Sequence, residues 1–103
     1  MSKDNNKIIT EDLTFIANSS LPWHKLKSKT VIVTGGGGFI GSYLVKALLH
    51  ICKKYDLNIK VICVARKIES VNFRLIDYLD NKNFSKFLFA VLVKFYLNKI
   101  ILP

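Results

Sequence analysis

The stretch VIVTGGGGFIGSYLVKALL covers residues 31–49 and contains all five glycines of the chain. The run from Thr30 to Thr34 is short and β-branched, as is typical of a buried parallel strand. After Gly38 the period changes, because Ile40 and Leu44 begin a series at helical spacing. The stretch therefore predicts a strand, a glycine-rich turn and a helix in direct succession.

The same alternation continues toward the C-terminus. Residues 59–65 (IKVICVA) are a second candidate for a buried strand, helical spacing returns over residues 71–79, and residues 87–93 (FLFAVLV) resemble a third strand. The segments KYDLN and DNKN separate these elements. Strands that alternate with helices predict the α/β class, with a parallel sheet and crossover helices. We therefore predict a partial Rossmann-like sheet of about three strands.

A short helical arm is predicted before this unit. Thr10 is placed to cap a helix whose first turn holds Glu11 and Asp12, and residues 1–6 are expected to be loose. The segment NSSLPW at residues 18–23 ends the helix. Trp23 and Leu26 are expected to pack the arm on the main body. The predicted organisation is an arm over residues 1–28 and a partial Rossmann domain over residues 29–103.

Composition limits the class of protein. The chain has 103 residues, enough for one small domain, and half of them are hydrophobic, enough for a core. Its net charge of +9 suits anionic partners such as nucleotides. The lysines are scattered, and no clustered basic face or aromatic stacking motif indicates nucleic acid. The apolar C-terminal stretch is interrupted by Lys94 and Lys99 and is short for a membrane span, so we expect neither nucleic acid nor a membrane as partner.

The polar N-terminus lacks the apolar segment of a signal peptide. Cys52 and Cys63 are not spaced as a redox or metal pair and are expected to be buried free thiols. These features predict a cytoplasmic protein. His24 and His50 have no metal-binding spacing, so no metal site is predicted.

Gly35, Gly38 and Gly41 follow a GxxGxxG pattern between the predicted strand and helix. A helix N-terminus offers unpaired N–H groups and a positive dipole end, which suits a pyrophosphate. The first glycine permits the tight turn, the second lets the backbone approach the phosphates, and the third lets the helix pack closely. The other two glycines add freedom to the loop. A phosphate-binding P-loop is excluded because Ser42 and Tyr43 stand where Lys and Ser/Thr are needed. A glycine-rich turn without a ligand stays open as the alternative.

The segment VTGGGGFIGSYLVKALL closely resembles the TGxxGxxG segment of extended short-chain dehydrogenases/reductases, and more narrowly the NAD-dependent epimerase/dehydratase family that acts on nucleotide sugars. The preceding LPWHKLKSKTVIVTG is similar to members related to dTDP-glucose dehydratases and UDP-glucuronate decarboxylases. The resemblance extends from Trp23 to Phe87. It implies a nicotinamide cofactor, a nucleotide-sugar substrate and, for full-length relatives, a homo-oligomer. It does not choose among epimerase, dehydratase, decarboxylase and reductase.

Carried over residue by residue, the resemblance implies that Gly35, Gly38 and Gly41 line the cofactor pyrophosphate. Phe39 and Ile40 would complete the turn between them.

The same resemblance bears on the choice of cofactor. Relatives that prefer NAD carry an acidic residue at the end of the second strand, where it binds the adenosine ribose. Ala65 stands there in this chain, and Arg66 follows it. The missing acid and the adjacent guanidinium favour NADP over NAD. The alternative is that Arg66 points into solvent and NAD binds through backbone contacts.

The catalytic residues of the family are a Ser or Thr and a Tyr-x-x-x-Lys pair on a long helix further along the chain. The match at Tyr78 and Lys82 falls on the predicted helix before the third strand, which is the wrong element. Family members also often carry an Asp near the end of the third strand, beside the adenine. This chain has Ala90 in that region and no acidic residue nearby. No catalytic residue is therefore assigned. We expect a truncated, NAD(P)-binding N-terminal part that is not catalytic alone. The alternative is a non-catalytic nucleotide-binding or interaction module.

Overall fold

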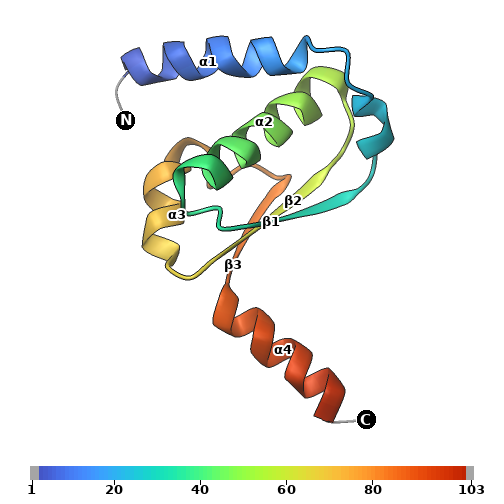
Figure 1. Ribbon diagram of the computed structural model, residues 1–103, viewed down its shortest axis with the longest axis vertical. Coiled ribbons are helices and arrows are strands. Elements are labelled where there is room, and N and C mark those ends of the chain that lie inside the picture. Colours follow the sequence, from blue (N-terminus) through green and yellow to red (C-terminus); the bar gives the residue numbers. More distant parts are fainter. Residues whose placement is uncertain (1–2, 102–103) are drawn as a thin grey trace.

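A computed structural model describes the backbone of residues 3–101 and the side chains of residues 7–100 (Figure 1). Its elements in chain order are the helix α1 (Lys3–Ala17), the 3-10 turn η1 (Trp23–Leu26), the strand β1 (Thr30–Thr34), the helix α2 (Phe39–Tyr55), the strand β2 (Lys60–Ala65), the helix α3 (Ile68–Arg74), the 3-10 turn η2 (Ile76–Tyr78), the strand β3 (Phe84–Leu88) and the helix α4 (Phe89–Ile101).

The three strands form one parallel sheet in the order β1-β2-β3. Thr34 pairs with Val64, and Val64 pairs with Phe87, so the carboxyl ends of the strands meet at one edge. α2 connects β1 to β2, and α3 with η2 connects β2 to β3 (Figure 1). This arrangement confirms the predicted partial Rossmann-like α/β sheet. The first strand and the start of the helix after Gly38 lie where the sequence predicts them, and the second strand begins one residue later.

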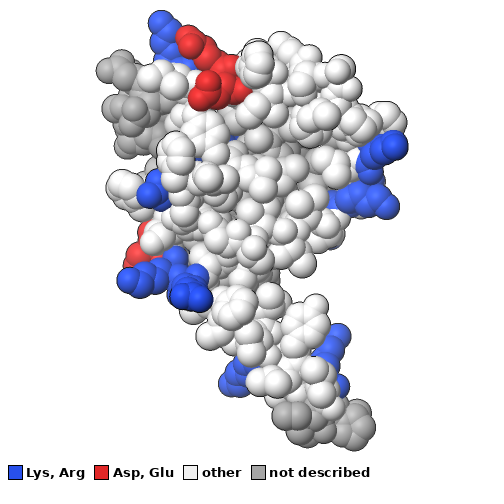
Figure 2. Space-filling model, in the orientation of Figure 1, with Lys and Arg blue, Asp and Glu red and all other residues white. Residues whose placement is uncertain are grey.

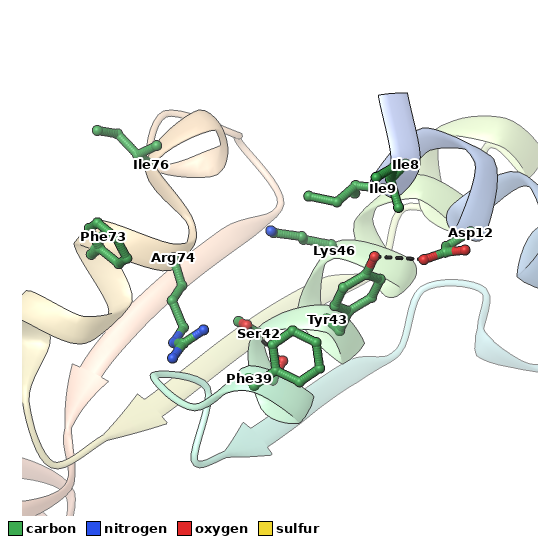
Figure 3. A pocket seen from close by; sticks show the side chains of 10 residues that line it. All are labelled: Ile8, Ile9, Asp12, Phe39, Ser42, Tyr43, Lys46, Phe73, Arg74 and Ile76. Carbon is green, nitrogen blue, oxygen red and sulfur yellow. Dashed lines mark hydrogen bonds between the residues drawn. The ribbon is translucent and has the colours of Figure 1, made fainter. Parts of the chain in front are cut away.

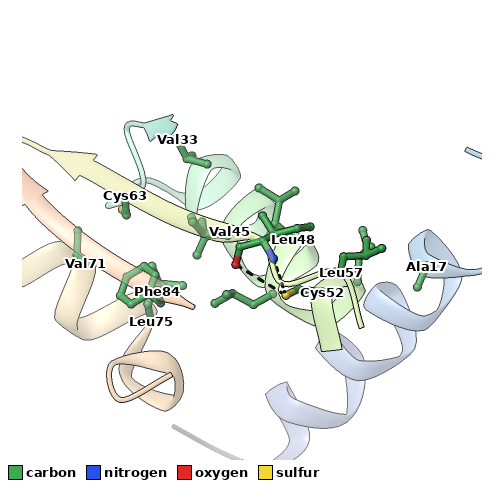
Figure 4. Close-up of a cluster of buried hydrophobic side chains, with 14 of the residues drawn as sticks. Ala17, Val33, Val45, Leu48, Cys52, Leu57, Cys63, Val71, Leu75 and Phe84 are labelled. Carbon is green, nitrogen blue, oxygen red and sulfur yellow. Dashed lines mark hydrogen bonds between the residues drawn. The ribbon is translucent and has the colours of Figure 1, made fainter. Parts of the chain in front are cut away.

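The core lies between one face of the sheet and the two connecting helices (Figure 4). Val33, Val61 and Cys63 point from the strands toward buried side chains of α2 such as Val45, while Leu75 closes the cluster after α3. Each fully buried Val, Ile or Leu contributes roughly 1.5–3 kcal/mol to stability. The buried cluster therefore fixes α2 and α3 on the sheet and holds the loops at its carboxyl edge in place.

Both cysteines are buried free thiols, as predicted. The sulfur of Cys52 accepts a hydrogen bond from the Ile59 backbone N–H at 3.2 Å, which joins the end of α2 to the start of β2. Burial raises the pKa of the Cys63 thiol above its ordinary value, so this side chain stays neutral in the core.

The N-terminal helix packs along α2 and is tied to it by side chains (Figure 1). The Tyr43 hydroxyl donates to the Asp12 carboxylate at 2.8 Å, and the Tyr55 hydroxyl donates to the Ala17 carbonyl at 2.5 Å. Leu13 is buried in this contact. The prediction that the helix starts at Thr10 was wrong, because the helix already begins at Lys3. Packing on α2 stabilises a longer helix than the local capping signal indicated. Residues 1 and 2 lie outside the described residues.

The turn after the arm confirms a further expectation. Trp23 and Leu26 are partly buried against the core cluster.

The prediction of a third strand at residues 87–93 was wrong in its bounds. β3 spans Phe84–Leu88, and α4 begins at Phe89. Strand pairing explains this difference. Leu88 pairs with Ala65, the last residue of β2, so the residues after Leu88 have no β2 residue to pair with. A short apolar run is compatible with strand or helix, and only the sheet register decides between them. The helix predicted over residues 71–79 is also divided, since α3 ends at Arg74 and η2 follows.

α4 projects from the body of the molecule and packs mainly against β3 (Figures 1 and 2). Its large side chains are exposed, including Phe95, Tyr96 and Ile100. On the face drawn in Figure 2 the Lys and Arg side chains form separate patches, as the scattered lysines in the sequence indicate. Within the described part of the chain, no helix combines the length and apolar character that crossing a membrane requires.

Candidate functional site

The glycine loop joins β1 to α2 at the carboxyl edge of the sheet. The Gly35 N–H donates to the Val64 carbonyl at 2.9 Å, and the Gly38 N–H donates to the Gly35 carbonyl at 3.0 Å, which closes a tight turn. Gly35 has a φ of +71°, in the left-handed region. A residue with a side chain would pay roughly 1–2 kcal/mol to adopt this conformation. The turn out of β1 therefore favours glycine at this position.

Gly41 is required for a different reason, which is close packing. A Cβ atom at Gly41 would lie 2.2 Å from the Gly35 carbonyl oxygen and 2.7 Å from the Gly35 carbonyl carbon. Real Cβ atoms do not approach backbone atoms so closely. The absence of a side chain at Gly41 lets the first turn of α2 pack directly on the loop.

Sequence reasoning missed the role of Gly36. A Cβ atom there would lie 1.9 Å from the Cys63 sulfur on β2. Gly36 is buried, so the loop is pressed against the sheet rather than merely flexible. Gly37 is also confined, since its Cβ would lie 3.0 Å from the Ser70 Cβ. The run of four glycines was the available sequence signal for a confined loop. The contact of Gly36 with Cys63 could not be predicted from it, because this contact depends on the pairing of β1 with β2.

Gly38 is exposed, as is Gly35, but unlike Gly35 it has an ordinary backbone conformation. A Cβ atom there would meet only the Gly35 carbonyl oxygen, at 3.4 Å, and its φ of −86° is open to any residue. Gly38 caps α2, and the first backbone bond of the helix runs from the Ser42 N–H to the Gly38 carbonyl at 3.0 Å. The N–H groups of Phe39, Ile40 and Gly41 precede that bond and have no acceptor within the helix. They and the positive end of the helix dipole can hold an anion.

A cavity of about 530 Å³ opens beside this loop at the ends of β1 and β2. It brings together Gly35, Gly38 and Arg66, three of the residues that the sequence analysis singles out. Ala65 is the last residue of β2, and the exposed Arg66 follows it directly. Phe39, Ile40 and Gly41 lie next to the cavity in the first turn of α2 but do not line it.

The cavity wall includes residues that sequence reasoning did not single out. Lys67 and Ser70 come from the start of α3, and Phe89 comes from the start of α4. Among the described residues that line the cavity, the charged ones are Arg66 and Lys67, and both are cations. This charge suits a ligand that carries phosphate groups. Lys67 could have been predicted as a site residue, because it directly follows Arg66. Phe89 could not, because the sequence analysis placed it inside a strand rather than at the start of α4.

Tyr78 and Lys82 do not line this cavity. Tyr78 ends η2 and is partly buried against the core, while Lys82 lies in the turn before β3, so the two do not share a helix as predicted. Burial and the neighbouring Asp77 raise the pKa of the Tyr78 hydroxyl, which keeps it protonated. In the part of the chain that the structure describes, no three His, Cys, Asp or Glu side chains are grouped to hold a metal ion.

Comparison with known proteins bears on the same segment. The sequence model of the NAD dependent epimerase/dehydratase family matches residues 31–96, which include the glycine loop, β2 and β3. Comparisons with curated proteins and with solved structures gave no match. The family match covers more than half of the 103 residues and contains the cavity-lining residues described above. The chain therefore belongs to the NAD-dependent epimerase/dehydratase family.

Proposed function

We propose that this chain supplies the NAD(P)-binding function of a nucleotide-sugar epimerase/dehydratase, and that the cavity beside the glycine loop holds the dinucleotide. Membership of the family indicates a nicotinamide dinucleotide as cofactor. The observation that carries the proposal is the exposed Gly38 at the N-terminus of α2, where free N–H groups and an open approach coincide.

The residues present fit such a cofactor. The pyrophosphate would lie against the N–H groups of the first turn of α2, where the missing side chain of Gly38 leaves room for close approach. Gly35 and Gly41 hold the loop in this shape. A bound nicotinamide would supply the hydride acceptor for oxidation of the sugar. The residues described here bind and orient the dinucleotide.

The adenosine end favours NADP in this proposal. No acidic side chain among the described residues lines the cavity to repel a 2′-phosphate, and Arg66 with Lys67 can pair with it. The two buried free thiols support the cytoplasmic location expected from the sequence.

Replacing Arg66 with alanine should reduce the preference for NADP over NAD. The affinity ratio should fall by about ten-fold or more, because one charge-assisted hydrogen bond to the 2′-phosphate is lost. Calorimetric titration with the two cofactors measures this ratio. Arg74→Ala removes the other arginine, which lies outside the cavity, and should leave the ratio unchanged. A clear preference of the unmutated chain for NAD would contradict the argument.

The 103 residues should bind cofactor without turning over a substrate. Oxidation of a sugar hydroxyl moves a hydride from the carbon and a proton from the oxygen, so it needs a base within hydrogen-bond reach of that oxygen. The Tyr78 hydroxyl is partly buried, protonated and outside the cavity wall. With UDP-, GDP- and dTDP-sugars we expect neither product nor a change in NADH or NADPH absorbance. Turnover that disappears in Tyr78→Phe would refute this expectation and place the pair in the active site.

A non-catalytic nucleotide-binding module is the second candidate. It is favoured by the position of Tyr78 outside the cavity wall, where the hydroxyl cannot act on a bound substrate. The two candidates differ in the ligand that fills the cavity. A dinucleotide site should bind NADP more tightly than ADP, because both halves of the ligand make contacts. Equal affinity for ADP and NADP would favour the nucleotide module.

A further inference from the structure

A second cavity, of about 600 Å³, lies between α1, α2 and the segment of α3 and η2 (Figure 3). It shares no lining residue with the cavity beside the glycine loop. The arm forms one wall with Ile8, and the segment after β2 forms the opposite wall with Phe73 and Ile76. Its volume is in the range of small-molecule sites, which is about 300–1,000 Å³.

A buried lysine extends into this cavity. Lys46 is only 5% exposed, and its ammonium group points from α2 toward the α3 side (Figure 3). Within the described residues it has no hydrogen bond and no ion pair, and its Nζ lies 5.7 Å from the centre of the Tyr43 ring. Burial of a charged group without a partner is costly. Desolvation lowers the pKa of Lys46, Arg74 adds to this effect, and Asp77 opposes it.

A second cation faces the same space. Arg74 at the end of α3 lines the cavity, and among residues 7–100 its guanidinium has no carboxylate partner. The acidic residue in the wall, Asp12, lies on the α1 side and accepts a hydrogen bond from the Tyr43 hydroxyl at 2.8 Å (Figure 3). The α3 side of the cavity therefore holds two positive charges. Asp77 in η2 acts on Lys46 from a distance, but among residues 7–100 it forms no ion pair with it.

The remaining wall is apolar and open. Ile8, Phe39, Phe73 and Ile76 are each more than half exposed although they line the cavity. A ligand that covers these side chains would remove apolar surface from water, which is favourable by roughly 25 cal/mol per Å².

We propose that this cavity binds an amphipathic anion, with its carboxylate or phosphate head between Lys46 and Arg74 and its apolar body against Phe39, Phe73 and Ile76. The guanidinium fork of Arg74 suits an oxyanion, and the ammonium of Lys46 gains an ion-pair partner that the described side chains do not provide. The site is separate from the dinucleotide site, so its test does not depend on the proposed function.

Octanoate is a suitable probe, since it combines a carboxylate with an apolar chain. Titration of the 103-residue chain, followed by ¹⁵N–¹H NMR, should shift the amides around residues 8–12, 42–46 and 73–76 in a saturable way. Lys46→Met should weaken octanoate binding by about ten-fold or more. The melting temperature of this variant should stay close to that of the unmutated chain, because the Lys46 ammonium forms no hydrogen bond or ion pair among residues 7–100 and methionine keeps the apolar stem.

The controls separate charge from apolar contact. Lys53→Met removes an exposed lysine of the same helix and should leave the affinity unchanged. Octanol, the uncharged counterpart, should bind more weakly than octanoate and should not respond to Lys46→Met. Arg74→Met should weaken octanoate binding as well, so the proposal stays testable if one variant folds poorly. Unchanged octanoate affinity in both variants, equal binding of octanol or inorganic phosphate, or shifts confined to α4 would overturn the proposal.

Discussion

Replacing Gly41 with alanine should lower the free energy of unfolding by about 3 kcal/mol or more, which is a large part of the ~5–15 kcal/mol that a domain of this size possesses. The new Cβ atom would lie 2.2 Å from the Gly35 carbonyl oxygen. Gly35 cannot easily move, because its N–H is bonded to Val64 and its carbonyl accepts the Gly38 N–H. The first turn of α2 would therefore have to separate from the loop, and the packing of α2 on the sheet would be lost with it.

Urea unfolding followed by circular dichroism measures this effect. Gly38→Ala is the matched control, since it adds the same methyl group three residues earlier, where the nearest atom outside its chain neighbours is 3.4 Å away. That variant should unfold within about 1 kcal/mol of the unmutated chain, as expected for a glycine replaced at an exposed position with an ordinary φ. Similar stability of the Gly41→Ala variant and the unmutated chain would contradict the loop geometry.

Replacing Gly38 with valine should weaken dinucleotide binding strongly and leave the fold in place. The side chain would extend from an exposed position of the loop into the cavity, where the pyrophosphate must approach the backbone. Loss of two hydrogen bonds to a charged phosphate weakens binding by roughly 100-fold. Calorimetric titration with NADP and NAD gives the affinity, and the far-ultraviolet circular dichroism spectrum shows whether the fold is kept. Equal binding by the folded variant would remove the basis for the site.

The region from β1 to the start of α2 could be predicted from sequence because its signals are local. A β-branched run can form a buried strand, and the glycines mark the turn out of it at Gly35. β2 was predicted to within one residue for the same reason. Such signals act within a few residues of each other and require no knowledge of the rest of the fold.

The C-terminal region could not be predicted in this way. The run from Phe87 to Val93 has no local signal that distinguishes strand from helix, and its structure depends on where β2 ends at Ala65. The start of α1 at Lys3 depends likewise on contacts with α2, which lies far along the chain.

In the candidate site, too, some features follow from local sequence signals and others only from tertiary packing. Gly35, Gly38 and Arg66 could be named from the glycine pattern and the end of the second strand, and the structure places them around one cavity. The contact of Gly36 with Cys63 and the exposure of the Lys46 ammonium to a second cavity arise only from tertiary packing.

The most direct measurement of the central claim is a titration of the ¹⁵N-labelled chain with NADP, followed residue by residue. Binding at the glycine loop predicts saturable shifts of the Phe39, Ile40 and Gly41 amides, because these N–H groups stand at the free end of α2. Shifts of the Arg66 and Lys67 amides should follow the same binding curve, since both residues line the same cavity. Saturable binding that leaves all of these amides unmoved would contradict the account.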